Sequence, residues 1–214
     1  RTNRYTGRPY SEDKAIMSWQ VSNEPRAFSR DNKDAFAVWM RDVTALIRSL
    51  DPNHLISSGS EGSKGSENDM ELWRRVHSDP NIDYVNIHCW PNNWRWIDKQ
   101  DIPGTLSTAL VNTMQYIYDH CAIARTLDKP LVMEEFGMPR DGFLFTPATT
   151  TACRDLYYRT IFEWLLYNAR TNGIFAGCNF WAWGGSTRPT EGQVCWRQGD
   201  AYLGDPAQAE QGLN

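Results

Sequence analysis

The chain has 214 residues, a formal net charge of −4 and a pI near 5.6, so it lacks the excess of Lys and Arg that marks nucleic-acid-binding proteins. Apolar residues make up 41% of the sequence, and no apolar run reaches the roughly 18 residues that a membrane span needs. We therefore expect residues 1–214 to fold as part of a single globular domain, with no nucleic-acid partner and no membrane span.

Five short apolar segments, each bounded by turn residues, predict β-strands. Their hydrophobicity is nearly continuous, which is typical of strands covered on both faces. The segments are residues 15–22, 54–59, 84–90, 130–136 and 177–183.

Helices are predicted between these strands, because apolar residues there repeat every three or four positions. The repeats run over residues 35–50, 70–76, 106–124 and 158–169. Strands that alternate with helices, through connections too long for hairpins, indicate a parallel sheet wrapped by helices.

Two architectures fit this alternation, an open doubly wound sheet and a closed (β/α)8 barrel, and both place functional residues at the carboxyl ends of strands. Here such residues follow four different strands, which favours the rim of a barrel over the single crevice of an open sheet. A barrel needs eight strands, so the five predicted ones correspond to strands four to eight. The fold class is thus an α/β (TIM) barrel whose first three strands lie outside this sequence.

Two glutamates at strand ends are the strongest functional signal. Glu24 follows the first predicted strand and Glu135 ends the fourth. A carboxyl group at the end of a buried apolar strand is costly to desolvate, so it usually has a chemical role there. A pair of carboxyl groups without other catalytic residues is typical of glycoside hydrolysis.

The two glutamates lie in motifs that resemble glycoside hydrolase family 5. In that family an Asn-Glu-Pro ends barrel strand four and carries the acid/base, and a Glu before an aromatic-Gly pair ends strand seven and carries the nucleophile. The matching runs are Asn23-Glu24-Pro25 and Glu135-Phe136-Gly137, with two further strands between them. Further segments are similar to the endo-β-1,4-mannanase subfamily, namely residues 5–7, 13–19, 204–206 and 210–212.

The resemblance implies roles for other residues. It places Arg26 against the sugar on the leaving-group side, His88 along the cleft and Trp181 under the sugar that is cleaved. Asn23 would hydrogen-bond the substrate 2-hydroxyl. One position departs from the broader family, because Trp90 stands where a Tyr usually orients the nucleophile; an indole has one N–H donor and no acceptor. We expect Trp90 to line the sugar site.

The implied mechanism sets physical requirements for the two glutamates. Glu24 must be protonated when substrate arrives, so its pKa should be raised, and a negative Glu135 nearby would raise it by like-charge repulsion. A retaining enzyme holds its two carboxyl groups about 5 to 5.5 Å apart, and an inverting one about 6.5 to 9.5 Å apart.

Structural roles are also open to each of these residues. Glu24 could cap a helix that follows Pro25, Glu134 competes with Glu135 because side chains alternate along a strand, and His88 could be a hydrogen-bonded core residue. The indoles of Trp94 and Trp96 could stack on sugars or pack against the barrel rim.

The sequence thus predicts a retaining endo-β-1,4-mannanase that is secreted, periplasmic or cell-surface and acts on a β-mannan polysaccharide. The five cysteines show no C-x-x-C spacing, and we expect no metal and no cofactor. Two rival functions stay open, a β-1,4-glucanase on the same scaffold and a carbohydrate-binding barrel without catalysis. The missing N-terminal half of the barrel is the expected partner.

Overall fold

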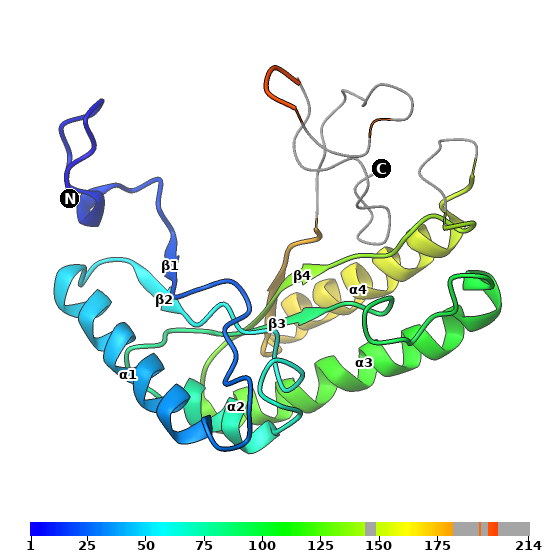
Figure 1. Ribbon diagram of the computed structural model, residues 1–214, viewed down its shortest axis with the longest axis horizontal. Coiled ribbons are helices and arrows are strands. Elements are labelled where there is room, and N and C mark those ends of the chain that lie inside the picture. The colour runs from blue at the N-terminus through cyan, green and yellow to red at the C-terminus, as the bar shows by residue number, and fades with distance from the viewer. Residues whose placement is uncertain (144–148, 182–192, 194–196, 201–214) are drawn as a thin grey trace. The chain divides into compact units, whose positions relative to one another are not determined.

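The computed structural model describes residues 1–143, 149–181, 193 and 197–200 (Figure 1). The tail motifs at residues 204–206 and 210–212 lie outside the described residues. The end of the fifth predicted strand, residues 182 and 183, also lies outside them.

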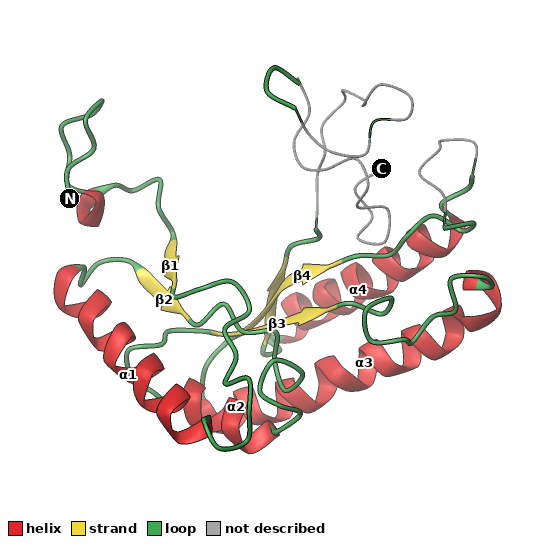
Figure 2. Ribbon diagram, in the orientation of Figure 1, coloured by secondary structure: helices red, strands yellow, loops and turns green. Residues whose placement is uncertain are grey.

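The chain forms two compact units. The first contains residues 1–88 and 120–132, and the second contains residues 89–119 and 133–214. Helices and strands alternate along the chain in both (Figure 2).

The first unit begins with a short 3-10 helix, η1 (Tyr10–Glu12), and contains the parallel strands β1 (Ser18–Gln20) and β2 (Leu55–Ser57). Helix α1 (Lys33–Leu50) connects them, and α2 (Met70–His77) follows β2. Since a helix joins two adjacent parallel strands, this is a β-α-β unit.

Helices α1 and α2 pack together through apolar side chains in the first unit. The buried cluster contains Met40 of α1, Leu72 and Val76 of α2, and Ile82 in the loop that follows. Trp73 of α2 is also fully buried, and its indole Nε1 donates to the carbonyl of Asn86 at 3.3 Å. Burying these side chains is the main source of stability for the β-α-β unit.

A second sheet has the strand order β3-β4-β5, where β3 is Val85–Cys89, β4 is Leu131–Phe136 and β5 is Phe175–Cys178. Helix α3 (Ile102–Leu127) joins the first two, and α4 (Ala152–Thr171) joins the last two. All five residues of β3 are buried, as expected for a strand covered on both faces.

Aromatic side chains form much of the core of the second unit. Phe136 at the end of β4 contacts Tyr157 and Tyr158 of α4, with ring centroids 6.4 and 5.0 Å apart. The ring centroids of the loop residues Trp94 and Trp96 are 4.8 Å apart, and both rings pack on Tyr116 of α3. The structure therefore favours the packing interpretation for both indoles.

The predicted alternation of strands and helices is confirmed, with one shift. Strand β5 ends at Cys178, whereas the sequence predicted residues 177–183. The predicted strand runs past the end of β5 because hydrogen bonding to β4 continues beyond the regular strand. The N–H groups of Asn179 and Trp181 donate to the carbonyls of Met133 and Phe136, both at 2.9 Å. None of the described helices combines the length and the apolar character that a membrane crossing requires.

Candidate active site

Glu24 lies in the loop that connects β1 to α1. Its backbone has a positive φ of 47°, an uncommon conformation for a residue other than glycine. Its N–H donates to the carbonyl of Gly59 at 2.9 Å. The next helix, α1, begins only at Lys33, so the interpretation in which Glu24 caps a helix directly after Pro25 is wrong.

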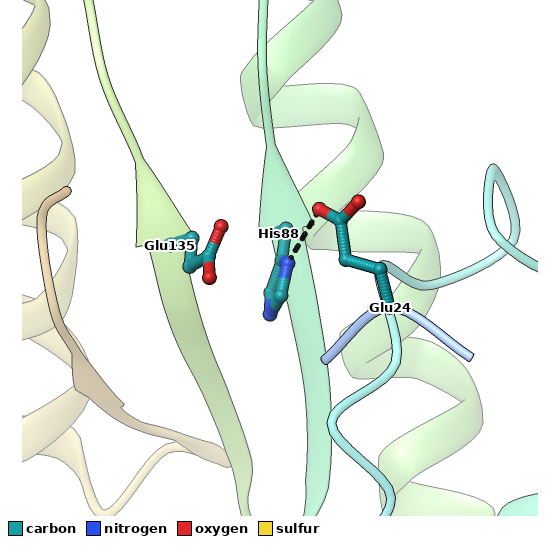
Figure 3. A group of neighbouring side chains, drawn as sticks. All are labelled: Glu24, His88 and Glu135. Carbon is teal, nitrogen blue, oxygen red and sulfur yellow. Dashed lines mark hydrogen bonds and ion pairs between the residues drawn. The ribbon is translucent and has the colours of Figure 1, made fainter. Parts of the chain in front are cut away.

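The side chain of Glu24 is hydrogen-bonded to His88 of β3, as Figure 3 shows. Nδ1 of His88 and Oε1 of Glu24 are 2.9 Å apart, and the His88 side chain is 2% exposed while that of Glu24 is 27% exposed. His88 is therefore buried, as a core histidine would be, and is also in direct contact with the proposed acid/base. Histidine and glutamate are both residue types that bind divalent metals, but here Nδ1 of His88 is hydrogen-bonded to the Glu24 carboxylate.

The hydrogen bond to His88 lowers the pKa of Glu24 below its ordinary value. Burial raises the pKa and opposes this effect in part, and electrostatic interactions with His88 and Arg26 lower the pKa further. The expectation of a raised pKa is therefore wrong for this arrangement, because hydrogen bonding to the charged form outweighs desolvation.

Arg26 extends the site on the same loop. Its guanidinium forms an ion pair with Glu61, which follows β2; the Arg26 side chain is 36% exposed and that of Glu61 only 4%. The carbonyl of Glu61 also accepts a hydrogen bond of 3.2 Å from the N–H of His88. The residues after β2 thus contact both Arg26 and His88.

A pocket of about 490 Å³ opens beside this loop in the first unit. Asn23, Glu24 and Arg26 contribute its polar side, and residues of α1 and the exposed Phe28 contribute apolar surface. The volume falls within the range of ligand pockets.

Glu135 belongs to the second unit and projects from β4, as labelled in Figure 3. It is half-buried, whereas its neighbour Glu134 is 9% exposed, so the two side chains have different environments along the strand. Trp90, directly after β3, is 4% exposed. Trp181, just after β5, is 43% exposed.

The first unit therefore brings together four of the predicted residues, and the other three belong to the second unit. The four are Asn23, Glu24, Arg26 and His88. Gly59 and Glu61 were not predicted from the sequence. The available signal was the polar, glycine-rich run at residues 58–63 directly after an apolar strand, where the carboxyl end of a barrel strand carries function.

Comparison with known proteins identifies the family of this chain. The family model described as glycoside hydrolase family 5, β-mannosidase-like, matches residues 1–214. The chain belongs to glycoside hydrolase family 5.

A solved family 5 mannosidase from Rhizomucor miehei is 36% identical and superposes with a TM-score of 0.82, covering 100% of this chain and 50% of its own. An endo-β-1,4-mannanase from Thermotoga petrophila is 25% identical with a TM-score of 0.64, covering 89% of this chain and 40% of its own. A putative mannan endo-1,4-β-mannosidase of Oryza sativa subsp. japonica is 31% identical over 194 residues, which is 85% of this chain and 44% of the relative.

These relatives establish the family 5 fold, the (β/α)8 barrel, of which this chain forms a part. The chain spans about half the length of the relatives it matches. Its sequence is that of a glycoside hydrolase family, and the relatives it matches are named mannanases or mannosidases.

Proposed function

We propose that the complete protein is a retaining endo-β-1,4-mannanase that hydrolyses internal β-mannosidic bonds in mannan, glucomannan or galactomannan. The main support is the placement of Glu24 at a pocket after β1, bonded to buried His88, in a chain whose curated relatives are named mannan endo-1,4-β-mannosidases. The proposal extends that name to this chain.

In the proposed mechanism Glu135 attacks the anomeric carbon and forms a glycosyl-enzyme intermediate, while Glu24 donates a proton to the leaving group. Glu24 then acts as a base toward water. Its lowered pKa in the first unit means that the acid form must be stabilised when the site is complete. A negative Glu135 close to Glu24 would supply this stabilisation, since two neighbouring carboxylates resist ionising together.

Four further residues have proposed contacts with sugar. Asn23 is exposed at the pocket and available for the 2-hydroxyl, and Arg26 lines the same pocket on the proposed leaving-group side. The 43% exposure of Trp181 suits stacking under a pyranose ring. Trp90 has little exposed surface, so its proposed contact is restricted to an edge of the indole.

A second candidate is an exo-acting β-mannosidase. The matching family model is described as β-mannosidase-like, and the structure with 36% identity is titled a mannosidase. Endo and exo enzymes on one scaffold differ in the loops that open or close the ends of the substrate groove. A β-1,4-glucanase and a barrel that binds carbohydrate without cleavage are the remaining rival functions.

The proposed partner of this chain is the segment that carries the first three barrel strands. In the described residues β1 has β2 as its sheet neighbour, and its other edge has backbone groups available for pairing. Several large apolar side chains of α1 are exposed, as is expected of a surface that another element covers: Val38 46%, Trp39 42%, Leu46 58% and Leu50 70%.

The catalytic assignment is tested by replacing each glutamate in the complete protein. We expect Glu135→Ala to abolish turnover, and Glu24→Ala to retain slow glycosylation of activated aryl mannosides, whose leaving group needs no acid. Glu163→Ala, an exposed glutamate of α4, is the control and should keep full activity. Full activity of the Glu24 variant on polymer would refute the assignment.

Product analysis separates the candidate functions. An endo enzyme lowers the viscosity of mannan rapidly and releases oligosaccharides, whereas an exo enzyme releases mannose from chain ends. Release of reducing sugar from carboxymethylcellulose but not from mannan would instead indicate a glucanase. Binding of oligosaccharide without any cleavage over days would indicate a binding protein.

Location and completion are tested separately. We propose that the protein is secreted, periplasmic or cell-surface, since its proposed substrate is a polysaccharide; fractionation of cells that produce it would check this. Co-expression of this chain with a segment carrying the first three strands should give activity that neither piece has alone.

A further inference from the structure

The short segment of residues 59–61 after β2 holds three residues of the proposed site. The carbonyl of Gly59 accepts the N–H of Glu24 at 2.9 Å, and the carbonyl of Glu61 accepts the N–H of His88 at 3.2 Å. The carboxylate of Glu61 pairs with Arg26. Glu24 and Arg26 lie in the loop after β1 and His88 lies in β3, so the segment supports two separate parts of the chain.

Buried hydrogen bonds fix the segment itself. Ser58 Oγ donates to Asn86 Oδ1 at 2.8 Å and accepts from the N–H of Ser60 at 3.1 Å. Asn86 Nδ2 in turn donates to the carbonyl of Ser60 at 3.2 Å. Ser58 and Asn86 are fully buried, and satisfied buried networks of this kind rigidify their surroundings.

The ion pair places a negative charge directly beside a positive one at the edge of the pocket. Glu61 is 3% exposed, so its carboxylate is costly to bury without a partner. Arg26 lies close enough to Glu24 for its charge to stabilise the Glu24 carboxylate. In the described first unit, the charged or titratable groups around Glu24 are His88 from β3, Arg26 from its own loop, and Glu61 behind Arg26.

We propose that Glu61 is a positioning residue for the proposed glycosidase reaction, on which this inference rests. Its carboxylate holds Arg26 at the pocket and balances the Arg26 charge, so that Arg26 can bind the leaving-group side of a saccharide without locking Glu24 in the carboxylate form. Glu61 is itself buried and does not line the pocket, so this role needs no contact with the sugar.

Charge balance and positioning make different predictions for two Glu61 variants in the complete protein. Glu61→Gln removes the negative charge and leaves that of Arg26, so the pKa of Glu24 should fall by about 0.5 to 1 unit. The alkaline limb of kcat/KM against pH should move to lower pH by the same amount, because the acid must be protonated. Glu61→Asp keeps the charge on a shorter side chain, so the limb should stay in place while KM rises on the order of tenfold.

The titration of Glu24 is measured directly by carbon NMR of protein labelled at the glutamate carboxyl groups, with the signal assigned by its loss in Glu24→Gln. The double variant Arg26→Met/Glu61→Gln removes both charges and should return the Glu24 titration toward its original position. The control is Glu71→Gln, which removes a glutamate from an exposed ion pair with Arg74. It should change neither the Glu24 titration nor the pH dependence of kcat/KM.

An unchanged Glu24 titration in Glu61→Gln, or a double variant that titrates like Glu61→Gln, would overturn the inference. If Glu61→Gln does not fold, Arg26→Met gives the opposite test: it leaves the Glu61 charge, so the Glu24 titration should move to higher pH. Absence of hydrolysis by the unaltered protein refutes the proposed function. The NMR titration tests the effect of Glu61 on Glu24 independently of hydrolysis.

Discussion

Gly59 offers a direct test of how the loop after β2 supports the site. Its φ is +75°, and a Cβ at this position would lie 1.8 Å from the carbonyl oxygen of Ser22. That oxygen belongs to the backbone segment that leads into Glu24. The clash can therefore be relieved only by a backbone movement that displaces the segment carrying the proposed acid/base. Gly59→Ala therefore combines backbone strain with a steric clash.

The magnitude follows from these two contributions. An L-residue with this positive φ costs about 1 to 2 kcal/mol, and forcing extra volume into a packed site costs about 1 to 3 kcal/mol more. We expect Gly59→Ala to lower the free energy of unfolding by about 2 to 5 kcal/mol. Gly7 is a matched control, because its φ is +68° and a Cβ there would meet nothing within 4 Å.

Urea unfolding of the two variants and the unaltered protein measures the difference. Gly7→Ala should cost about 1 to 2 kcal/mol at most, from backbone strain alone. Gly59→Ala should also reduce kcat/KM, because the Gly59 carbonyl accepts the N–H of Glu24, whereas Gly7→Ala should not. Equal destabilisation by the two substitutions would show that the clash with Ser22 is absent and refute the reasoning.

Two further predictions concern the first unit. Hydrogen bonds from Trp19 and His54 lower the pKa of Asp51 despite its burial, and the Asp51 partner raises the pKa of His54, with Asp13 adding to the effect. The Asp51 contribution to stability is lost as pH falls below about 3.8, and the His54 contribution is lost as pH rises above about 6.5. The urea unfolding midpoint should therefore be constant between these two pH values and fall on either side. A His54→Gln variant whose midpoint falls equally at alkaline pH would contradict the role of His54. Asp69 caps α2 by accepting hydrogen bonds from the N–H groups of Glu71 and Leu72. Asp69→Ala should therefore lower the free energy of unfolding in urea by about 1 kcal/mol, whereas the exposed control Asp42→Ala should lower it by less than about 0.5 kcal/mol. Equal losses in the two variants would exclude the cap.

Local sequence patterns determined the order of elements in this protein. Apolar runs bounded by turn residues predicted the five strands, the fifth too late in the sequence, and the three- to four-residue repeats predicted helices α1 to α4. These signals are local, because burial of one helix face or of a short strand imposes its own periodicity on the sequence. The motifs around Glu24 and Glu135 also marked the ends of two strands correctly.

Only the tertiary structure decided the surroundings of Glu24. The hydrogen bond to His88 joins residues 64 positions apart, and the ion pair of Arg26 with Glu61 joins residues 35 apart. No local pattern encodes such contacts, so the sequence predicted a raised pKa for Glu24 where the structure gives a lowered one. The support from Gly59 and Glu61 was hidden for the same reason: what these residues do depends on the chain segments that folding brings against them.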